Sequence, residues 1–110
     1  MNTQFKAARA ENYRVSDRSA ADIRYLVIHF TANDGDTAKN NADYFAREAP
    51  GVSAHFFVDE KEIWQSVREQ DIAWHCGTRG MYFHPYCRNA NSLGIAAGNR
   101  AKSIILRLRP

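Results

Sequence analysis

The segment from Ile23 to Phe30 constrains the fold more than any other part of the chain. Its sequence, IRYLVIHF, is nearly continuous in apolar, β-branched and aromatic residues. This composition predicts a strand that is covered on both faces of a sheet. Side chains alternate along a strand, which divides this one into two faces. One face is expected to carry Tyr25, Val27 and His29, and the other Leu26, Ile28 and Phe30.

The segments that follow predict one helix and three further strands. After the turn residues 31–35, Asp36 or Thr37 can cap a helix whose apolar residues recur with helical spacing until Pro50-Gly51. A hairpin is expected next, from Val52–Val58 and Glu62–Val67, and a short buried strand at Ser92–Ala96. The order of elements indicates a single α/β domain with a mixed β-sheet flanked by helices.

Composition excludes several classes of protein. The chain has 110 residues, 45% of them hydrophobic and 25% charged, as in ordinary globular domains and unlike disordered or collagen-like chains. No apolar run approaches the roughly 18 residues of a membrane span. The polar N-terminus has no apolar stretch of the signal-peptide kind, which predicts synthesis in the cytoplasm without a signal peptide.

The net charge of +3 belongs to the end of the chain. All 12 acidic residues precede position 97, whereas residues 97–110 contain four basic residues. A near-neutral body of residues 1–96 with a basic tail of residues 97–110 does not indicate a nucleic-acid-binding face, so no nucleic-acid partner is expected. The alternating apolar residues of the tail fit either an added edge strand or an unstructured segment.

Histidines and cysteines are the candidates for chemistry. His29 ends the central strand, where α/β sheets commonly bind ligands. His55 fits a half-buried strand histidine, and His84 with Cys87 gives an H-x-x-C spacing that is too small a set for a zinc site. Cys76 and Cys87 leave three alternatives open, namely a single disulfide, free thiols or one metal ligand. By spacing alone, a hydrogen-bonded core histidine is the simpler explanation of both His29 and His55.

The ordered set of segments resembles one family. IRYLVIHFTAND, TAKNNADYFARE, GVSAHFFVDEKEIWQSV, DIAWHCG and CRNANSLGI occur here in the order typical of zinc-dependent N-acetylmuramoyl-L-alanine amidases, including phage and prophage endolysins. The resemblance runs from about Asn12 to Ile95. It implies a mixed sheet with a zinc ion in a groove, and hydrolysis of the amide between muramic acid and L-alanine in bacterial peptidoglycan.

The resemblance also assigns residues. His29 falls on the first zinc ligand, and the Trp74-His75 bend together with Asn91 is expected to line the groove that binds substrate. Ala54 falls where some members carry a catalytic tyrosine. The position of the family's catalytic glutamate is Ala96, so no catalytic residue is assigned. The family's other two zinc ligands follow in a later segment that has no counterpart here.

These departures shape the functional expectations. We expect a zinc-dependent amidase that is released at phage-type lysis and acts on the cell wall, with its metal site incomplete and the C-terminal part of the family fold missing. A truncation, a frame change near position 96 or a shortened chain would each produce this pattern. The alternatives are a catalytically inactive peptidoglycan-binding module of the same fold, and a binder of anionic polymers through the tail. Exposed apolar surface on the incomplete fold would also allow an oligomer.

Overall fold

A computed structural model gives the fold, and the structure describes residues 2–30, 37–76, 85–97 and 104–108. These residues form short strands, one α-helix and three 3-10 helices. In chain order they are β1 (Thr3–Phe5), η1 (Ala10–Asn12), β2 (Tyr13–Arg14), η2 (Ala20–Asp22), β3 (Tyr25–Phe30), α1 (Ala38–Arg47), β4 (Phe56–Val58), β5 (Ile63–Gln65), β6 (Ile72–Ala73), η4 (Asn89–Asn91), β7 (Ser92–Ala97) and β8 (Ile104–Arg107).

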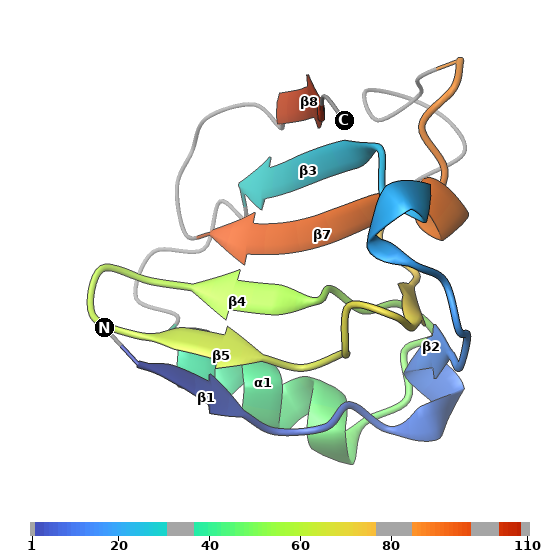
Figure 1. Ribbon diagram of the computed structural model, residues 1–110. Helices are drawn as coiled ribbons and strands as arrows, with labels where there is room; N and C mark the ends of the chain where they lie inside the picture. Colours follow the sequence, from blue (N-terminus) through green and yellow to red (C-terminus); the bar gives the residue numbers. More distant parts are fainter. Residues whose placement is uncertain (1, 31–36, 77–84, 98–103, 109–110) are drawn as a thin grey trace.

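A six-stranded mixed sheet organises the molecule, with the order β1-β5-β4-β7-β3-β8 (Figure 1). The central strand β7 runs parallel to both β3 and β4, whereas β5 is antiparallel to β4 and β8 is antiparallel to β3. A two-stranded pair, β2 with β6, lies beside it. The predicted α/β class with a mixed sheet is therefore confirmed.

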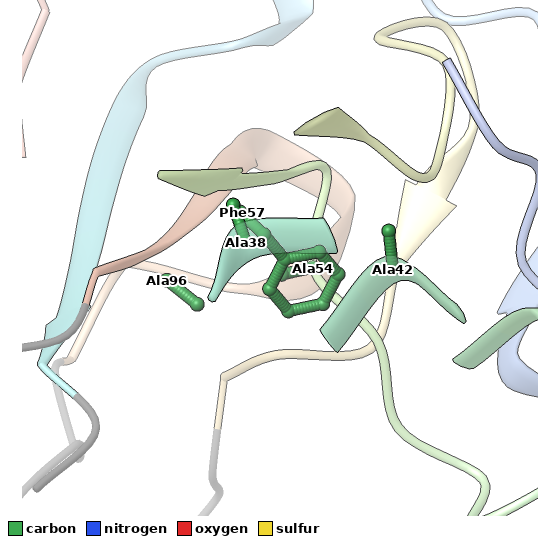
Figure 2. Packing of buried hydrophobic residues seen from close by; sticks show 5 residues of the cluster. All are labelled: Ala38, Ala42, Ala54, Phe57 and Ala96. Carbon is green, nitrogen blue, oxygen red and sulfur yellow. The ribbon is translucent and has the colours of Figure 1, made fainter. Parts of the chain in front are cut away.

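Helix α1 packs on one face of the sheet, across β4 and β5. Thr37 caps it, because the Thr37 side chain accepts a hydrogen bond from the backbone N–H of Asn40. Of the two capping alternatives, the structure thus uses Thr37. The helix contributes small side chains to a closely packed core, which Figure 2 shows. That core consists of Ala38, Ala42, Ala54, Phe57 and Ala96.

Strand β3 follows the predicted alternation, but only one of its faces is deeply buried. Tyr25 and Val27 are 6% and 1% exposed, and they pack with Cys87 on the helix side of the sheet. Leu26, Ile28 and Phe30 on the other face are only half-buried. The prediction of a strand covered on both faces is wrong for the described residues, whose one α-helix, α1, packs across β4 and β5.

Two other expectations differ in detail. The hairpin forms between β4 and β5, but β4 begins at Phe56, so His55 precedes the strand. Of the two alternatives for the tail, an edge strand or an unstructured segment, the structure shows the edge strand: Ile104–Arg107 pairs with β3 as β8. The turn at 31–35, His84 and residues 98–103 lie outside the described residues.

Candidate functional site

Three histidines gather on the helix side of the sheet, around the middle of β7. His29 comes from β3, His75 follows β6, and His55 precedes β4. The Nε2 atom of His29 lies 2.9 Å from Nδ1 of His75, and the two rings meet edge to face. The ring centroids of His55 and His75 are 6.0 Å apart. Residues 46 positions apart in the sequence are thus brought into direct contact.

The hydrogen bonds around His75 determine which of its two ring nitrogens carries the proton. The Ser92 hydroxyl donates to the backbone carbonyl of Arg88 at 2.7 Å, which uses its single proton. Ser92 Oγ also lies 2.9 Å from His75 Nε2, so the ring N–H at Nε2 must be the donor. A neutral His75 then has its lone pair on Nδ1, where it accepts the N–H of His29 Nε2. It follows that a neutral His29 has its lone pair on Nδ1.

Gly94 makes room for His75. A Cβ atom added at Gly94 would lie 2.4 Å from Cγ of His75, closer than real atoms approach. The ring therefore rests directly on the backbone of β7, and any larger residue at this position would displace it. The backbone N–H of Gly94 is used as well, since it donates to Nδ1 of His55 at 3.0 Å.

His55 is a structural residue of this cluster. It is fully buried, and with Nδ1 accepting from Gly94 its proton must be on Nε2, where it donates to the carbonyl of Asp71 at 2.9 Å. The Arg18 guanidinium, 3.1 Å from Nε2, therefore contacts the ring without donating to it. The reading of His55 as a hydrogen-bonded core histidine agrees with this geometry.

Burial keeps the cluster neutral at neutral pH. It lowers the pKa of His75 to about 2, helped by the neighbouring His29 and His55, and lowers the pKa of His55 to about 4. Burial also lowers the pKa of His29 below its ordinary value. Neutral imidazoles can accept protons or bind metal ions through a lone pair. In this arrangement both ring nitrogens of His55 and of His75 are used in hydrogen bonds, so neither of these two rings is suited to that role.

Two thiols border the histidines. Sγ of Cys76 lies 3.6 Å from Nδ1 of His75 and 3.9 Å from Sγ of Cys87, and neither cysteine is in a disulfide. Both side chains pack against Tyr25 and Val27 on the helix side of β3.

The residues expected to bind substrate are placed differently from one another. His75 lies at the centre of the histidine cluster. The neighbouring Trp74 is half-buried, and its backbone N–H donates to the Ser53 hydroxyl at 3.1 Å. The side-chain amide of Asn91 accepts from the N–H of Arg88 and donates to the carbonyl of Tyr86. Asn91 lines an open pocket of about 550 Å³ at the start of β3. The other lining residues are Arg24, Tyr25, Tyr86 and Arg107.

The described residues do not complete a zinc site. No group of three or more His, Cys, Asp or Glu side chains within them could hold a metal ion. The 2.9 Å between the nitrogens of His29 and His75 is a hydrogen-bond distance, shorter than the roughly 3.3 Å that separates two nitrogens on one tetrahedral zinc. Among the described residues, His29 is the one that the family resemblance assigns as a zinc ligand.

Ser92 and Gly94 are the site residues that the sequence analysis did not single out for a role. Both were part of the quoted segment CRNANSLGI, so the signal was available in the motif. Ala96, at the position of the family's glutamate, lies in the apolar core with Ala38 and Phe57. Ala54, at the position of the tyrosine of some members, lies in the same core.

Comparisons with known proteins agree on one family. A family model described as N-acetylmuramoyl-L-alanine amidase matches residues 19–104. The amidase CwlL of Bacillus licheniformis is 33% identical over 82 residues, and AmiD of Escherichia coli is 33% identical over 103 residues. A solved structure, a mutant endolysin from Bacillus subtilis, superposes with a TM-score of 0.67 at 27% identity and covers 89% of this chain.

The relatives are longer than this chain. The matches cover 69% and 82% of this chain but only 23% of CwlL and 35% of AmiD, and 61% of the endolysin structure. Among the described residues, no helix has the length and apolar character needed to cross a bilayer.

Proposed function

Because the chain belongs to the N-acetylmuramoyl-L-alanine amidase family, we propose that it acts on bacterial peptidoglycan and hydrolyses the amide between N-acetylmuramic acid and L-alanine. The observation that carries the proposal is the contact of His29 with His75 on the helix side of the sheet, inside the matched residues. We extend the proposal to the place of action, the cell wall, as for the endolysin to which the chain is similar.

His29 is the residue we assign to the reacting centre. Burial lowers the pKa of His29, which favours the neutral imidazole at neutral pH. A neutral imidazole is able to accept a proton during hydrolysis of an amide. Trp74 and Asn91 remain our candidates for the substrate groove. Both ring nitrogens of His75 are used by Ser92 and His29, which supports a positioning role for His75.

Zinc dependence is a separate proposal that rests on the family resemblance. His29 would supply one ligand, and the remaining ligands are not among the described residues. Metal analysis of the purified chain tests this, with His29→Ala as the control. Stoichiometric zinc that survives dialysis and is lost in the variant supports His29 as a ligand, whereas zinc retained equally in both rejects it.

A second candidate function is peptidoglycan binding without cleavage. The position of the family's glutamate is Ala96, whose side chain is 9% exposed and packs in the apolar core. An alanine has no group that can transfer a proton, and such a group typically contributes about 10²–10⁴-fold to a rate. This observation favours a chain that holds peptidoglycan but cleaves it slowly.

One experiment separates the two functions. Purified bacterial walls are incubated with the chain, with and without added zinc, and both the bound protein and the newly released amino groups of L-alanine are measured. Release that is abolished by a chelator and by His29→Ala establishes the amidase. Binding without release, unchanged in His29→Ala, establishes the binding module, and the absence of both rejects action on peptidoglycan.

A further inference from the structure

Cys76 and Cys87 form a thiol pair beside the histidine cluster, on its η4 side. Their sulfur atoms are 3.9 Å apart, although the residues are 11 positions apart in the chain. We propose that this pair is a disulfide-forming site that reacts with a low-molecular-weight disulfide such as oxidised glutathione. The proposal concerns the chain's own thiols and does not depend on amidase activity.

The surrounding hydrogen bonds hold the two thiols in reach of each other. The side-chain carbonyl of Asn89 accepts the backbone N–H of His75 at 3.1 Å and that of Cys76 at 2.7 Å. Asn89 begins η4, two residues after Cys87, so one amide ties the two cysteine-bearing segments together. A disulfide requires sulfurs about 2.05 Å apart, so the two sulfurs must approach by roughly 2 Å from their present separation of 3.9 Å.

The two cysteines differ in how readily they react. Cys76 is half-buried, whereas Cys87 is 6% exposed. Burial raises the pKa of the Cys87 thiol to about 11, with a further contribution from Cys76. Since the thiolate is the attacking species, Cys76 is the thiol that meets an oxidant first, and Cys87 is the one that resolves the intermediate.

The exchange is balanced in two steps. The Cys76 thiolate attacks the small disulfide, forms a mixed disulfide and expels one small thiolate. Cys87 gives its proton to that thiolate, and its sulfur attacks Sγ of Cys76, which expels the second thiolate. Two protein thiols are oxidised by two electrons in total, and one small disulfide is reduced to two small thiols.

The cross-link would reinforce the segment that carries His75. It would join the residue after His75 to the segment leading into η4, over the part of the core formed by Tyr25 and Val27. Closing a loop of this size stabilises the folded state by limiting the unfolded chain. For a domain of this length, the expected rise in Tm is about 10 °C.

The test begins with the reduced wild-type chain, treated with EDTA and equilibrated with excess oxidised glutathione. We expect the intact mass to fall by two hydrogens, peptide mapping to join Cys76 to Cys87, and Tm to rise by about 10 °C until reductant is added. Cys87→Ser is expected to stop at a glutathione adduct on Cys76. Cys76→Ser is expected to react much more slowly, because Cys87 is buried.

Other outcomes would overturn the proposal. Two thiols that remain reduced in the folded wild-type chain would show that the pair does not oxidise. A cross-link between chains, or zinc that both thiols hold until EDTA removes it, would assign the pair a different role. The wild-type measurement decides the proposal even where a serine variant fails to fold.

Discussion

Removing the Ser92 hydroxyl is the sharpest test of how the histidine cluster is held. Ser92 is fully buried, and its oxygen is the acceptor for the N–H at His75 Nε2. In Ser92→Ala this N–H loses its partner in a buried site. The carbonyl of Arg88 loses one donor but keeps the backbone N–H of Asn91 at 3.2 Å.

The magnitude follows from those two losses. A buried donor left without a partner destabilises a protein by about 1–3 kcal/mol. The carbonyl adds less because it keeps one bond, so the expected total is about 2–3 kcal/mol in the free energy of unfolding. For a domain of this size, that corresponds to a fall in Tm of roughly 10–20 °C.

Ser66 provides a matched control within the same chain. It is 1% exposed, and its hydroxyl makes no hydrogen bond within the described part of the chain. Ser66→Ala removes a polar atom that gains nothing from burial, so we expect its unfolding free energy to stay the same or rise by about 1 kcal/mol. Urea unfolding of the wild-type chain and the two variants measures the difference.

Histidine nitrogen NMR then tests the direction of the protons. In the wild-type chain the proton of His29 is expected on Nε2, and in Ser92→Ala a share of it is expected to move to Nδ1. The reasoning is refuted if the two serine variants are equally stable. It is also refuted if His29 in the wild-type chain carries its proton on Nδ1.

Three further predictions follow from other contacts. Gly94→Ala is expected to destabilise the fold by several kcal/mol, because the added Cβ would clash with His75. The loss is expected to be smaller in a background that also carries His75→Ala. Thermal unfolding of both single variants and the double variant measures this, and additive effects would contradict it. Stability is expected to fall as pH drops from 7 to 5, by about 2 kcal/mol for each of His55 and His75, because the unfolded chain gains protons below its histidine pKa of about 6.5 while the folded pKa values are lower still. Urea unfolding at these pH values measures it, and a flat or rising profile would count against the buried neutral cluster. Leu106 lies on the open face of the sheet and is 45% exposed. Leu106→Lys is therefore expected to change the free energy of unfolding by no more than about 0.5 kcal/mol and to lower the binding of an apolar dye. A large loss of stability would mean that this face is covered.

The elements that local patterns specify were predictable. Strand β3, helix α1 with its cap, and the β4–β5 hairpin each depend on residues within one short segment, and periodicity indicated all three. The start of β4 was missed by several residues because the hairpin pairing becomes irregular at His55, whose backbone carbonyl accepts from both Ser66 and Val67. The open second face of β3 was missed because an apolar run gives no information on what covers it.

The candidate site was predictable only in part. His29 and His75 were both singled out, but their contact joins segments 46 positions apart, and no local pattern reports such a distance. The role of Ser92 depends on where its one proton goes, which is set by the carbonyl of Arg88 in the turn before it. The side-chain amide of Asn91, a candidate for the substrate groove, is used at both ends by the turn around η4, which no pattern in the sequence reports.

The fully buried His55 and the half-buried His29 and His75 can share this space because the proton of each ring has an acceptor. His55 donates to the carbonyl of Asp71, His75 donates to Ser92, and His29 donates to His75. Charging His75 would place a proton on Nδ1, facing the N–H of His29, so protonation is opposed by geometry as well as by burial. The chain of donors therefore runs in one direction and ends at the Arg88 carbonyl. Both ring nitrogens of His55 and of His75 are used in these bonds, which makes His29 the histidine of the cluster to test for proton exchange or metal binding.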